Sequence, residues 1–441
     1  MRKLLLLSFI YSLISLSASA WTQVGASGLG GTVRALTTYN GQLIAGGDFT
    51  TPNRVAKFNG SSWVSLGSGL GTASSDKVNA LVVHGGKLYA AGVFSSTGGG
   101  TAVTNVAVYN SATDSWSAVG TTLVGEIKCL YSDGTYLWAG GTFSGKIASL
   151  NVSSNTWTQK TSLTQGVVND ICLYNGTYYV AVSSNPNLTC LSKLDGSTLT
   201  SVAPSSLGAF QYPAYALATY NNKLYVGGKL QYLSNYGVVA YDGSSFSVLP
   251  NPLEPNKIVY DLISDGTYLY GVGDFGSNNG YSVTINRVFK YHPNFRLSGI
   301  DNGFPANAVY CITRGSSYFA CGGDFTSTGL NSTTALRVAR TTDLTIGIDE
   351  PENVVIDYLI YPNPVIQSAT VRFTSRQYLR NASLHIIDQQ GRTLAEIPAD
   401  QSASNLTYEF PIDRADLAAG IYFYYLYADD IRPAGGRFIV Q

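Results

Sequence analysis

The chain has 441 residues, more than one compact core of ~100–200 residues usually holds, so two domains or a repeat array with a smaller module are expected. Charged residues make up only 12% of the chain, whereas Gly and Tyr are abundant, with 47 and 31 residues. The low content of charged residues excludes long charged helices and acidic or basic tails, and the balance of 27 basic against 27 acidic residues excludes a general field for binding nucleic acid.

Residues 1–20 have the pattern of a signal peptide. Arg2 and Lys3 give a positive start, an apolar stretch follows, and Ala18 and Ala20 supply the small residues that a signal peptidase requires. No later segment is long and apolar enough to span a bilayer. We therefore expect an exported mature chain without a transmembrane segment.

A repeat of 41 to 50 residues dominates the chain up to about residue 345. Each repeat begins with a four-residue segment of the form V-x-A-L, followed by a turn such as Asn40-Gly41 that closes a tight hairpin. The seven segments are residues 33–36, 78–81, 127–130, 168–171, 214–217, 259–262 and 309–312.

Three further strands complete each repeat. The second strand ends in a pair of small residues, best seen at Gly46-Gly47, and the third has an aromatic end. The fourth opens on a large residue, which in the first six repeats is Trp63, Trp116, Trp157, Leu199, Phe246 and Phe295. Four short strands repeated seven times predict an all-β fold, a seven-bladed β-propeller over residues 21–345.

The seventh repeat lacks a Trp where its fourth strand should begin. Residues 21–25 read like residues 63–67, so we expect the N-terminal strand to pair beside residues 337–340 and cover an exposed sheet edge. The alternative is that residues 344–346 form the fourth strand and Trp21 packs on the rim.

The repeat order V-x-A-L, Gly-Gly, an aromatic residue near Asn or Asp, then Trp resembles kelch-type propeller repeats, most closely over residues 105–116. The fourth repeat departs from the pattern, with Val182-Ser183 in place of the glycine pair and Leu199 in place of Trp. Because kelch-like propellers host many functions, the resemblance implies a fold rather than an activity.

The composition shifts after the last repeat. Residues 346–441 contain no Lys and only seven Arg against twelve acidic residues. We interpret residues 346–352 as a linker and residues 353–441 as a separate domain, whose short alternating strands predict a small immunoglobulin-like β-sandwich.

This C-terminal module closely resembles the type A C-terminal sorting domain of the type IX secretion system of the Bacteroidetes lineage. The matching positions include Tyr361, Pro362, Asn363, Pro364, Gly391, Gly420, Tyr422 and Arg437. Each also has a structural interpretation, because Pro362-Asn363-Pro364 suits a strand-entry turn and Gly420 a hairpin turn. The resemblance implies the type IX secretion machinery as a partner and a secreted or outer-membrane-surface location, reached through the periplasm.

Five cysteines are present, without the spacing of a zinc site or a dense disulfide framework. Cys311 and Cys321 flank a short Gly-Ser turn, and both a disulfide across this hairpin and a pair of small buried thiols stay open.

Catalytic motifs are absent from the sequence. His84 and His292 are the only histidines of the predicted propeller, and Glu126 and Glu254 its only glutamates, so copper-oxidase and glycosidase chemistry is disfavoured. We predict no cofactor and no resident metal. Asp48, Asp274 and Asp324 recur after the second strand of three repeats; they suit loop capping better than a shared calcium ion, because equivalent positions on separate blades lie far apart.

The remaining candidate is a binding face formed by the loops after the second strands. Tyr212, Tyr232, Tyr236 and Tyr281 lie in such stretches and could stack on sugar rings or anchor a protein, although each could also pack locally. We favour a non-catalytic secreted propeller that binds extracellular glycan or protein. The alternatives are a polysaccharide-acting enzyme with a propeller active site and a structural adhesion or surface-layer component.

Overall fold

The computed structural model describes residues 21–441 except for short segments. The segments left out are 209–210, 234, 251–252, 279–280, 294–295, 301, 330–332, 342–354, 376–381, 389–391, 400–406 and 429–430. Ala18, Ala20, Gly391 and the predicted linker 346–352 therefore lie outside the described residues. Within the described part, no helix has the length and apolarity that crossing a bilayer requires.

The chain is built from β-strands and divides into two compact units, the second of which contains residues 345–441. In the described residues, seven four-stranded antiparallel sheets, numbered 1 to 7 here, are formed before residue 342. Sheets 1 to 3 consist of β2 (Val33–Tyr39), β3 (Gln42–Gly47), β4 (Val55–Phe58) and β5 (Trp63–Ser65); β6 (Lys77–His84), β7 (Lys87–Val93), β8 (Val106–Asn110) and β9 (Ser115–Ala118); and β10 (Ile127–Ser132), β11 (Leu137–Gly141), β12 (Ile147–Asn151) and β13 (Thr156–Gln159).

The other four sheets follow the same order, except that the last recruits the N-terminal strand. Sheets 4 and 5 consist of β14 (Val167–Tyr174), β15 (Thr177–Ser183), β16 (Leu191–Asp195) and β17 (Thr198–Ser201); and β18 (Ala214–Tyr220), β19 (Lys223–Tyr232), β20 (Asn235–Tyr241) and β21 (Phe246–Val248). Sheets 6 and 7 consist of β22 (Ile258–Ser264), β23 (Leu269–Asp274), β26 (Val288–His292) and β27 (Arg296–Gly299); and β28 (Val309–Arg314), β29 (Phe319–Gly323), β32 (Val338–Thr341) and β1 (Thr22–Gln23).

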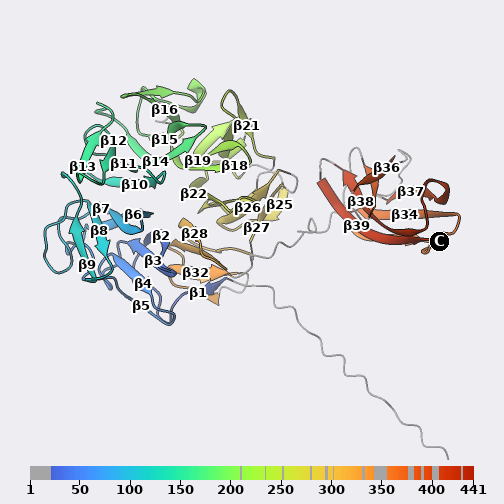
Figure 1. The fold of residues 1–441 in the computed structure, drawn as a ribbon, viewed down its shortest axis with the longest axis horizontal. Helices are drawn as coiled ribbons and strands as arrows, with labels where there is room; N and C mark the ends of the chain where they lie inside the picture. Colours follow the sequence, from blue (N-terminus) through green and yellow to red (C-terminus); the bar gives the residue numbers. More distant parts are fainter. Residues whose placement is uncertain are drawn as a thin grey trace, which may run out of the picture. The chain divides into compact units, whose positions relative to one another are not determined.

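The first strand of each sheet faces the centre of a closed ring (Figure 1). These inner strands are β2, β6, β10, β14, β18, β22 and β28. Each lies beside the inner strand of the next sheet, and β28 lies beside β2. The predicted all-β propeller is confirmed.

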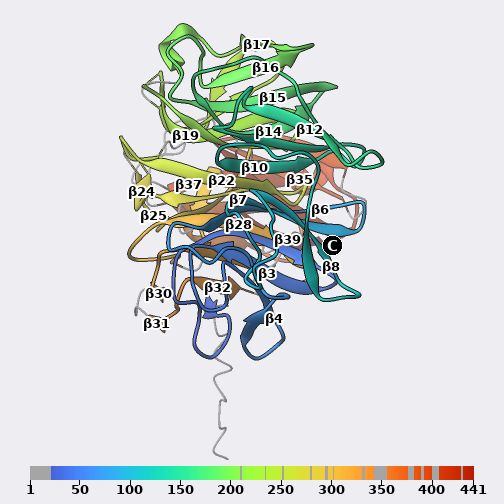
Figure 2. The ribbon, with the colours of Figure 1, turned by 90° about the vertical axis from the view of Figure 1, so that its left-hand side faces the viewer.

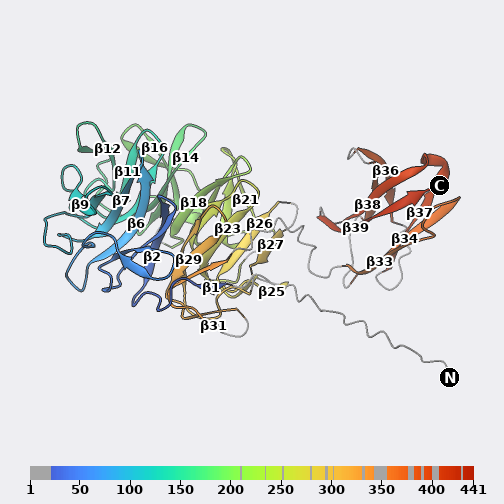
Figure 3. The same ribbon diagram turned by 60° about the horizontal axis from the view of Figure 1, so that its bottom comes forward.

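Two short hairpins extend the second and third strands of sheets 6 and 7. They are formed by β24 (Ser277–Asn278) with β25 (Tyr281–Thr284) and by β30 (Ser327–Thr328) with β31 (Thr333–Thr334). Both hairpins project on the same face of the ring, as Figures 2 and 3 show.

The V-x-A-L segment forms a β-bulge at the start of every inner strand. In sheet 1, Val33 pairs with Gly47 and Ala35 with Gly46, which leaves Arg34 without a partner across the ladder. The same register shift recurs in the other six sheets. Each sheet therefore presents one unpaired inner-strand residue at the equivalent position.

The glycine pair makes room for this bulge and for the next sheet. A Cβ atom on Gly46 would lie 2.6 Å from Val78 Cγ1 of sheet 2, and one on Gly47 would clash with the carbonyl oxygen of Thr32. The equivalent contacts join Gly140 to Val168, Gly227 to Val259 and Gly322 to Val33. The glycine pair of one sheet thus packs directly against the V-x-A-L segment of the neighbouring sheet.

The N-terminal strand β1 completes sheet 7, as predicted. Thr22 pairs with Arg340 of β32, and the Val24 amide donates to the carbonyl oxygen of Val338 at 3.0 Å. The Trp21 side chain is buried, and its indole N–H donates to the carbonyl oxygen of Ile300 at 3.0 Å, at the end of sheet 6.

The same indole bond links three further pairs of neighbouring sheets, where a tryptophan of a fourth strand donates to the fourth-strand region of the preceding sheet. The bonds run from Trp63 to Val24 at 2.8 Å, from Trp116 to Leu66 at 2.8 Å and from Trp157 to Val119 at 3.0 Å. Trp21 occupies the position that these three tryptophans define, which is why the N-terminal strand closes the ring.

Two aspartates form a second kind of joint, between neighbouring inner strands. Asp170 in sheet 4 accepts N–H groups from Ile171 at 2.8 Å and from Leu217 of sheet 5 at 2.8 Å. Asp261 in sheet 6 accepts in the same way from its own strand and from Ile312 of sheet 7, at 2.8 and 2.9 Å. Burial raises the pKa of each carboxyl to about 7, although these backbone donors oppose the shift.

Cys311 and Cys321 are buried free thiols. Across the β28–β29 ladder, Cys311 lies opposite Gly322 and Cys321 lies opposite Ile312. Because successive side chains of a strand point to opposite faces, the two sulfurs lie on different faces of the sheet, which rules out the disulfide. Burial raises the pKa of both thiols.

The second unit is a two-layer sandwich, so the predicted small C-terminal sandwich is confirmed. One layer contains β33 (Val355–Tyr361), β34 (Ser368–Ser375) and β37 (Thr407–Asp413), and the other β36 (Thr393–Pro398), β35 (Ser383–Ile387), β38 (Gly420–Ala428) and β39 (Ile431–Val440). Phe373 and Phe410 of the first layer and Leu384, Tyr424 and Phe438 of the second share one buried core.

The Pro362-Asn363-Pro364 turn is tied to the last strand. Asn363 Oδ1 accepts the Ile439 N–H at 3.0 Å, and the Val365 N–H donates to the Ile439 carbonyl oxygen at 2.7 Å. The preceding Tyr361 side chain is 75% exposed. This turn follows β33, so it ends one strand and leads toward the next.

Gly420 opens β38 opposite Val440, and is not the hairpin-turn residue that the sequence suggested. Two positions later, the Tyr422 ring stacks on Phe438 with centroids 5.6 Å apart. Arg437 lies on the neighbouring strand β39. The described sorting-motif residues therefore gather around the terminal strand of the chain.

Candidate functional site

The seven unpaired bulge residues form what we call the inner rim of the ring. They are Arg34, Asn79, Lys128, Asn169, Tyr215, Tyr260 and Tyr310. All seven are only partly buried. Bulges commonly re-aim a side chain beside a functional site, and here the ring brings equivalent bulges of neighbouring sheets together.

Tyr215, Tyr260, Tyr310 and Arg34 form a continuous row from sheet 5 to sheet 1, here called the tyrosine arc. The ring centroids of Tyr215 and Tyr260 are 5.8 Å apart, and those of Tyr260 and Tyr310 are 5.0 Å apart, with tilted planes. The guanidinium carbon of Arg34 lies 5.9 Å from the Tyr310 ring centroid, at cation–π distance.

The three phenols differ in their partners. Tyr310 Oη donates to Asp324 Oδ2 at 3.0 Å. Burial and this carboxylate raise the pKa of Tyr310 to about 12, and burial raises the pKa values of Tyr215 and Tyr260. In the described part of the chain, neither the Tyr215 nor the Tyr260 hydroxyl makes a hydrogen bond, so both are neutral groups that can donate to a ligand.

Each of the three predicted aspartates pairs with an arginine. The pairs are Arg34 with Asp48 at 3.0 Å, Arg287 with Asp274 at 3.8 Å and Arg337 with Asp324 at 3.4 Å. Asp324 also accepts the Thr32 hydroxyl at 2.5 Å. The described partners of these three carboxylates are thus side chains rather than the loop N–H groups expected from the sequence, and each carboxylate faces one arginine.

The opposite part of the inner rim is polar and internally bonded. Glu126 Oε1 lies 2.9 Å from Lys77 Nζ, 3.0 Å from Lys128 Nζ and 2.9 Å from Asn79 Nδ2. Burial opposes ionisation of Glu126, but the two ammonium groups outweigh it and lower its pKa to about 2. The polar side chains of this part of the rim are therefore already bonded to one another.

Three of the four tyrosines singled out in the loops gather on the long β19–β20 hairpin. Tyr232 pairs with Asn235 in that hairpin and packs edge-on against Phe246, with centroids 6.3 Å apart, whereas Tyr236 pairs with Gln231. The Tyr212 hydroxyl lies 3.4 Å from the side-chain oxygen of Gln231.

Tyr281 belongs to a different hairpin. Tyr281 lies in β25, which pairs with β24 in the short hairpin that extends sheet 6, and its side chain lies outside the described part of the chain. The structure therefore brings Tyr212, Tyr232 and Tyr236 together and places Tyr281 on another sheet.

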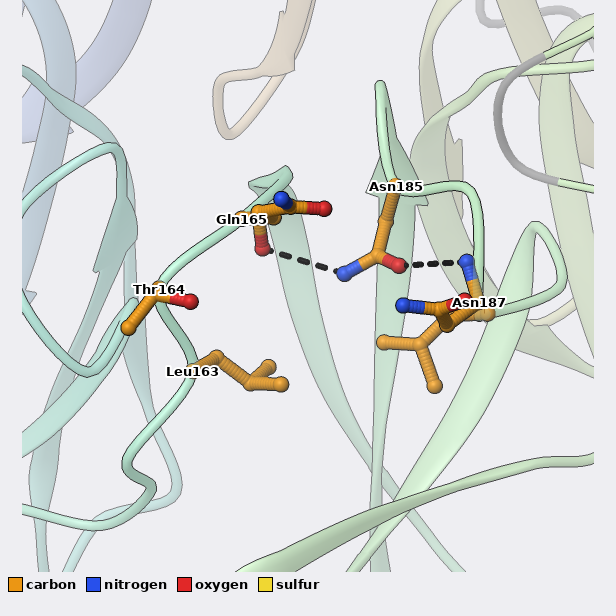
Figure 4. A pocket seen from close by; sticks show the side chains of 6 residues that line it. Leu163, Thr164, Gln165, Asn185 and Asn187 are labelled. Atoms are coloured by element: carbon orange, nitrogen blue, oxygen red, sulfur yellow. Dashed lines mark hydrogen bonds between the residues drawn. The ribbon is translucent and has the colours of Figure 1, made fainter.

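A pocket of about 250 Å³ lies between the connection from sheet 3 to sheet 4 and the loop after β15 (Figure 4). Leu163, Thr164, Gln165, Asn185, Asn187 and Leu188 line it. The buried Asn185 side chain points into the space between the two segments, donates to the Gln165 carbonyl oxygen at 3.0 Å and accepts the Asn187 N–H at 2.8 Å. Asn185 is therefore occupied in holding the pocket walls.

Sequence reasoning missed the tyrosine arc. Its signal was the x position of V-x-A-L, which holds Tyr215, Tyr260 and Tyr310 in the last three repeats. In a regular strand, side chains alternate between the two faces of the sheet, and this alternation predicts that such a residue is paired on one face. The bulge instead leaves it unpaired at the inner rim.

Comparison with known proteins identifies the C-terminal module. Residues 359–441 match the family model of the secretion system C-terminal sorting domain. None of the curated proteins matches the chain.

Solved structures resemble the fold at low sequence identity. The extracellular domain of a hybrid two-component system from B. thetaiotaomicron is 12% identical with a TM-score of 0.50, over 96% of this chain and 58% of that one. The chain thus spans less than two thirds of that protein. YCF48 bound to D1 peptide is 14% identical with a TM-score of 0.50, over 75% of this chain and 98% of the other.

The family match covers the strands in which the described sorting motifs gather around the chain end. The C-terminal module is therefore a type IX secretion sorting domain, which marks the chain as a secreted or cell-surface protein.

Proposed function

We propose that this protein is a non-catalytic, extracellular β-propeller that binds glycan or protein and reaches the outer-membrane surface through the type IX secretion system. In this proposal residues 1–20 are a cleaved signal peptide, and the seven sheets of residues 21–345 are the blades of a kelch-like propeller. Residues 346–352 are the linker, and residues 353–441 are the sorting domain.

The observation that carries the export route is the sorting-domain match at residues 359–441. The geometry supports it, since Asn363 is bonded to β39 and Gly420 and Tyr422 lie on the strand beside it. A recognition signal built around a terminal strand needs those contacts to hold its shape.

The binding role is supported by how the ring presents side chains. The hairpins β24–β25 and β30–β31 project on one face, and the inner rim carries a tyrosine arc whose hydroxyls are partly unused. Loops and rims on a rigid scaffold are where recognition residues concentrate. Release of reducing sugar from a bound glycan would instead favour the enzymatic alternative.

The export proposal is tested by truncation in a host that has a type IX secretion system. Residues 1–352 keep the signal peptide and the propeller but lack the sorting domain, so we expect this chain to accumulate in the periplasm. Immunoblots of periplasmic, surface and medium fractions measure the distribution, with the full chain as control. Normal surface delivery of the truncated chain would contradict the proposal.

A further inference from the structure

We propose that the tyrosine arc, Tyr215, Tyr260, Tyr310 and Arg34, is a binding site for a neutral saccharide. This inference rests on the proposed binding function and names the class of its ligand and the residues that hold it. It moves the site from the loop tyrosines suggested by the sequence to the inner rim.

The arc offers the two kinds of contact that a sugar requires. Sugar rings have apolar C–H faces, which pack on aromatic rings, and hydroxyls, which need donors and acceptors. The three tyrosine rings form an unbroken row with neighbouring centroids 5.8 and 5.0 Å apart. The Tyr215 and Tyr260 hydroxyls make no hydrogen bond in the described residues, so they can bond to sugar hydroxyls.

The charges near the arc favour a neutral ligand. Asp48, which pairs with Arg34, and Asp324, which binds Tyr310 and Arg337, are both neutralised by a neighbouring cation. A uronate or phosphate would need a cation that is not already paired. Without one, the carboxylates of Asp48 and Asp324 beside the arc would repel the negative charge of such a ligand. Asp48 and Asp324 keep oxygen lone pairs that can accept sugar hydroxyls.

The arc suits a sugar better than a peptide. Peptide recognition usually relies on aliphatic or aromatic anchors that enter apolar pockets, and the arc contains no aliphatic side chain. Its residues stand on inner strands held by hydrogen bonds along β18, β22, β28 and β2. Such side chains lose little freedom on binding, so the site is preorganised.

The experiment uses the purified mature chain, residues 21–441. Three probe sets are arrayed: neutral oligosaccharides of glucose, mannose, galactose and xylose; uronic acid oligosaccharides; and peptides. The variants are Tyr260→Ala, which removes the central ring, and Tyr260→Phe, which keeps the ring and removes only the hydroxyl. Tyr136→Ala is the matched control, because Tyr136 is an exposed tyrosine beside the β10–β11 turn and outside the arc.

We expect wild type to bind a neutral oligosaccharide, and Tyr260→Ala to weaken this binding about tenfold or more, the loss typical of truncating an aromatic anchor. Tyr260→Phe should lose less, and Tyr136→Ala should bind as wild type does. Thermal unfolding of every variant identifies any that fails to fold, and Tyr260→Phe, which keeps the ring packing, then decides the outcome.

If both Tyr260 variants bound neutral glycans as wild type does, the tyrosine arc would be rejected as the binding site, and the proposed binding function would stand. Binding of wild type only to uronic acid oligosaccharides or only to peptides would overturn the ligand class. Failure of wild type to bind any of the three sets would remove the inference together with the binding function, while the export test stays independent of both.

Discussion

The outer and inner parts of the ring are joined by different chemistry. At the outer strands, four tryptophan indoles donate to carbonyl oxygens of the preceding sheet, and none of these groups titrates near neutral pH. At the inner strands, Asp170 and Asp261 join two pairs of sheets through carboxyls that accept backbone N–H groups. Equivalent joints of one repeat architecture thus respond differently to pH.

The distribution of the two joints follows the sequence variation between repeats. Tryptophan joints connect sheets 6, 7, 1, 2 and 3 in turn, whereas sheets 4 and 5 have Leu199 and Phe246 at the equivalent position of their fourth strands. Where sheets 4 and 5 meet without an indole, Asp170 and the Tyr174 hydroxyl, which donates to the Asn222 carbonyl oxygen at 2.9 Å, take over. Sheets 6 and 7, by contrast, have both kinds of joint, the Trp21 indole bond and the Asp261 bond to Ile312.

The largest effect should come from removing the joint that closes the ring. Deleting residues 21–25 removes β1 and the buried Trp21 and exposes β32 as a sheet edge. We expect the free energy of unfolding to fall by at least about 3–5 kcal/mol, the cost of losing one buried Trp. Denaturant unfolding measures the loss, and Thr22→Ala, at an exposed position, is the control. Unchanged stability would reject the N-terminal strand as the latch.

The inner joints should make stability depend on pH. Because burial raises the folded-state pKa of Asp170 and Asp261 above the unfolded value of about 3.8, the folded chain binds these protons more tightly. The stability that the two protonated carboxyls contribute is fully present below about pH 4 and is lost as the pH rises through about 7. The slope is at most about 1.4 kcal/mol per pH unit for each carboxyl.

The measurement compares wild type with the double variant Asp170→Asn, Asp261→Asn by denaturant unfolding from pH 4 to pH 8. The difference in unfolding free energy should shift in favour of the variant as the pH rises. If the plots of unfolding free energy against pH were parallel for the two proteins, the two carboxyls would not be the source of the pH dependence. A constant difference in free energy between the proteins would not change this conclusion.

The smallest effect should come from a single outer joint. Trp157→Phe keeps an aromatic ring but loses the N–H that donates to the Val119 carbonyl oxygen at 3.0 Å. We expect a loss of about 1 kcal/mol, typical of one hydrogen bond, and the same loss at pH 5 and pH 8. A loss that changes with pH would break the distinction between outer and inner joints.

Much of the fold follows from local sequence patterns. Turn dipeptides such as Asn40-Gly41 and the alternation of apolar residues predict hairpins, and the likeness of residues 21–25 to residues 63–67 predicted the closing strand. The sorting motifs were likewise visible, because Tyr361 to Pro364 and Gly420 stand in a fixed order along the chain.

The candidate site depended on tertiary structure. Tyr215, Tyr260 and Tyr310 are 45 and 50 residues apart, and they meet only because bulges at equivalent positions are brought round the ring. The sequence pointed to Tyr212, Tyr232 and Tyr236 instead, since loops are the usual place for recognition residues.

The sequence by itself determined the strands, the repeat and the sorting domain, because hairpin turns and strand alternation act between residues close along the chain. Only the tertiary structure decided that Asp170 accepts the Leu217 N–H of the next sheet and that Cys311 and Cys321 lie on different faces of their sheet. Those outcomes depend on ladder register and on ring closure, which join residues 47 positions apart in the case of Asp170. Contacts over such separations arise from packing the whole ring, so no local pattern specifies them.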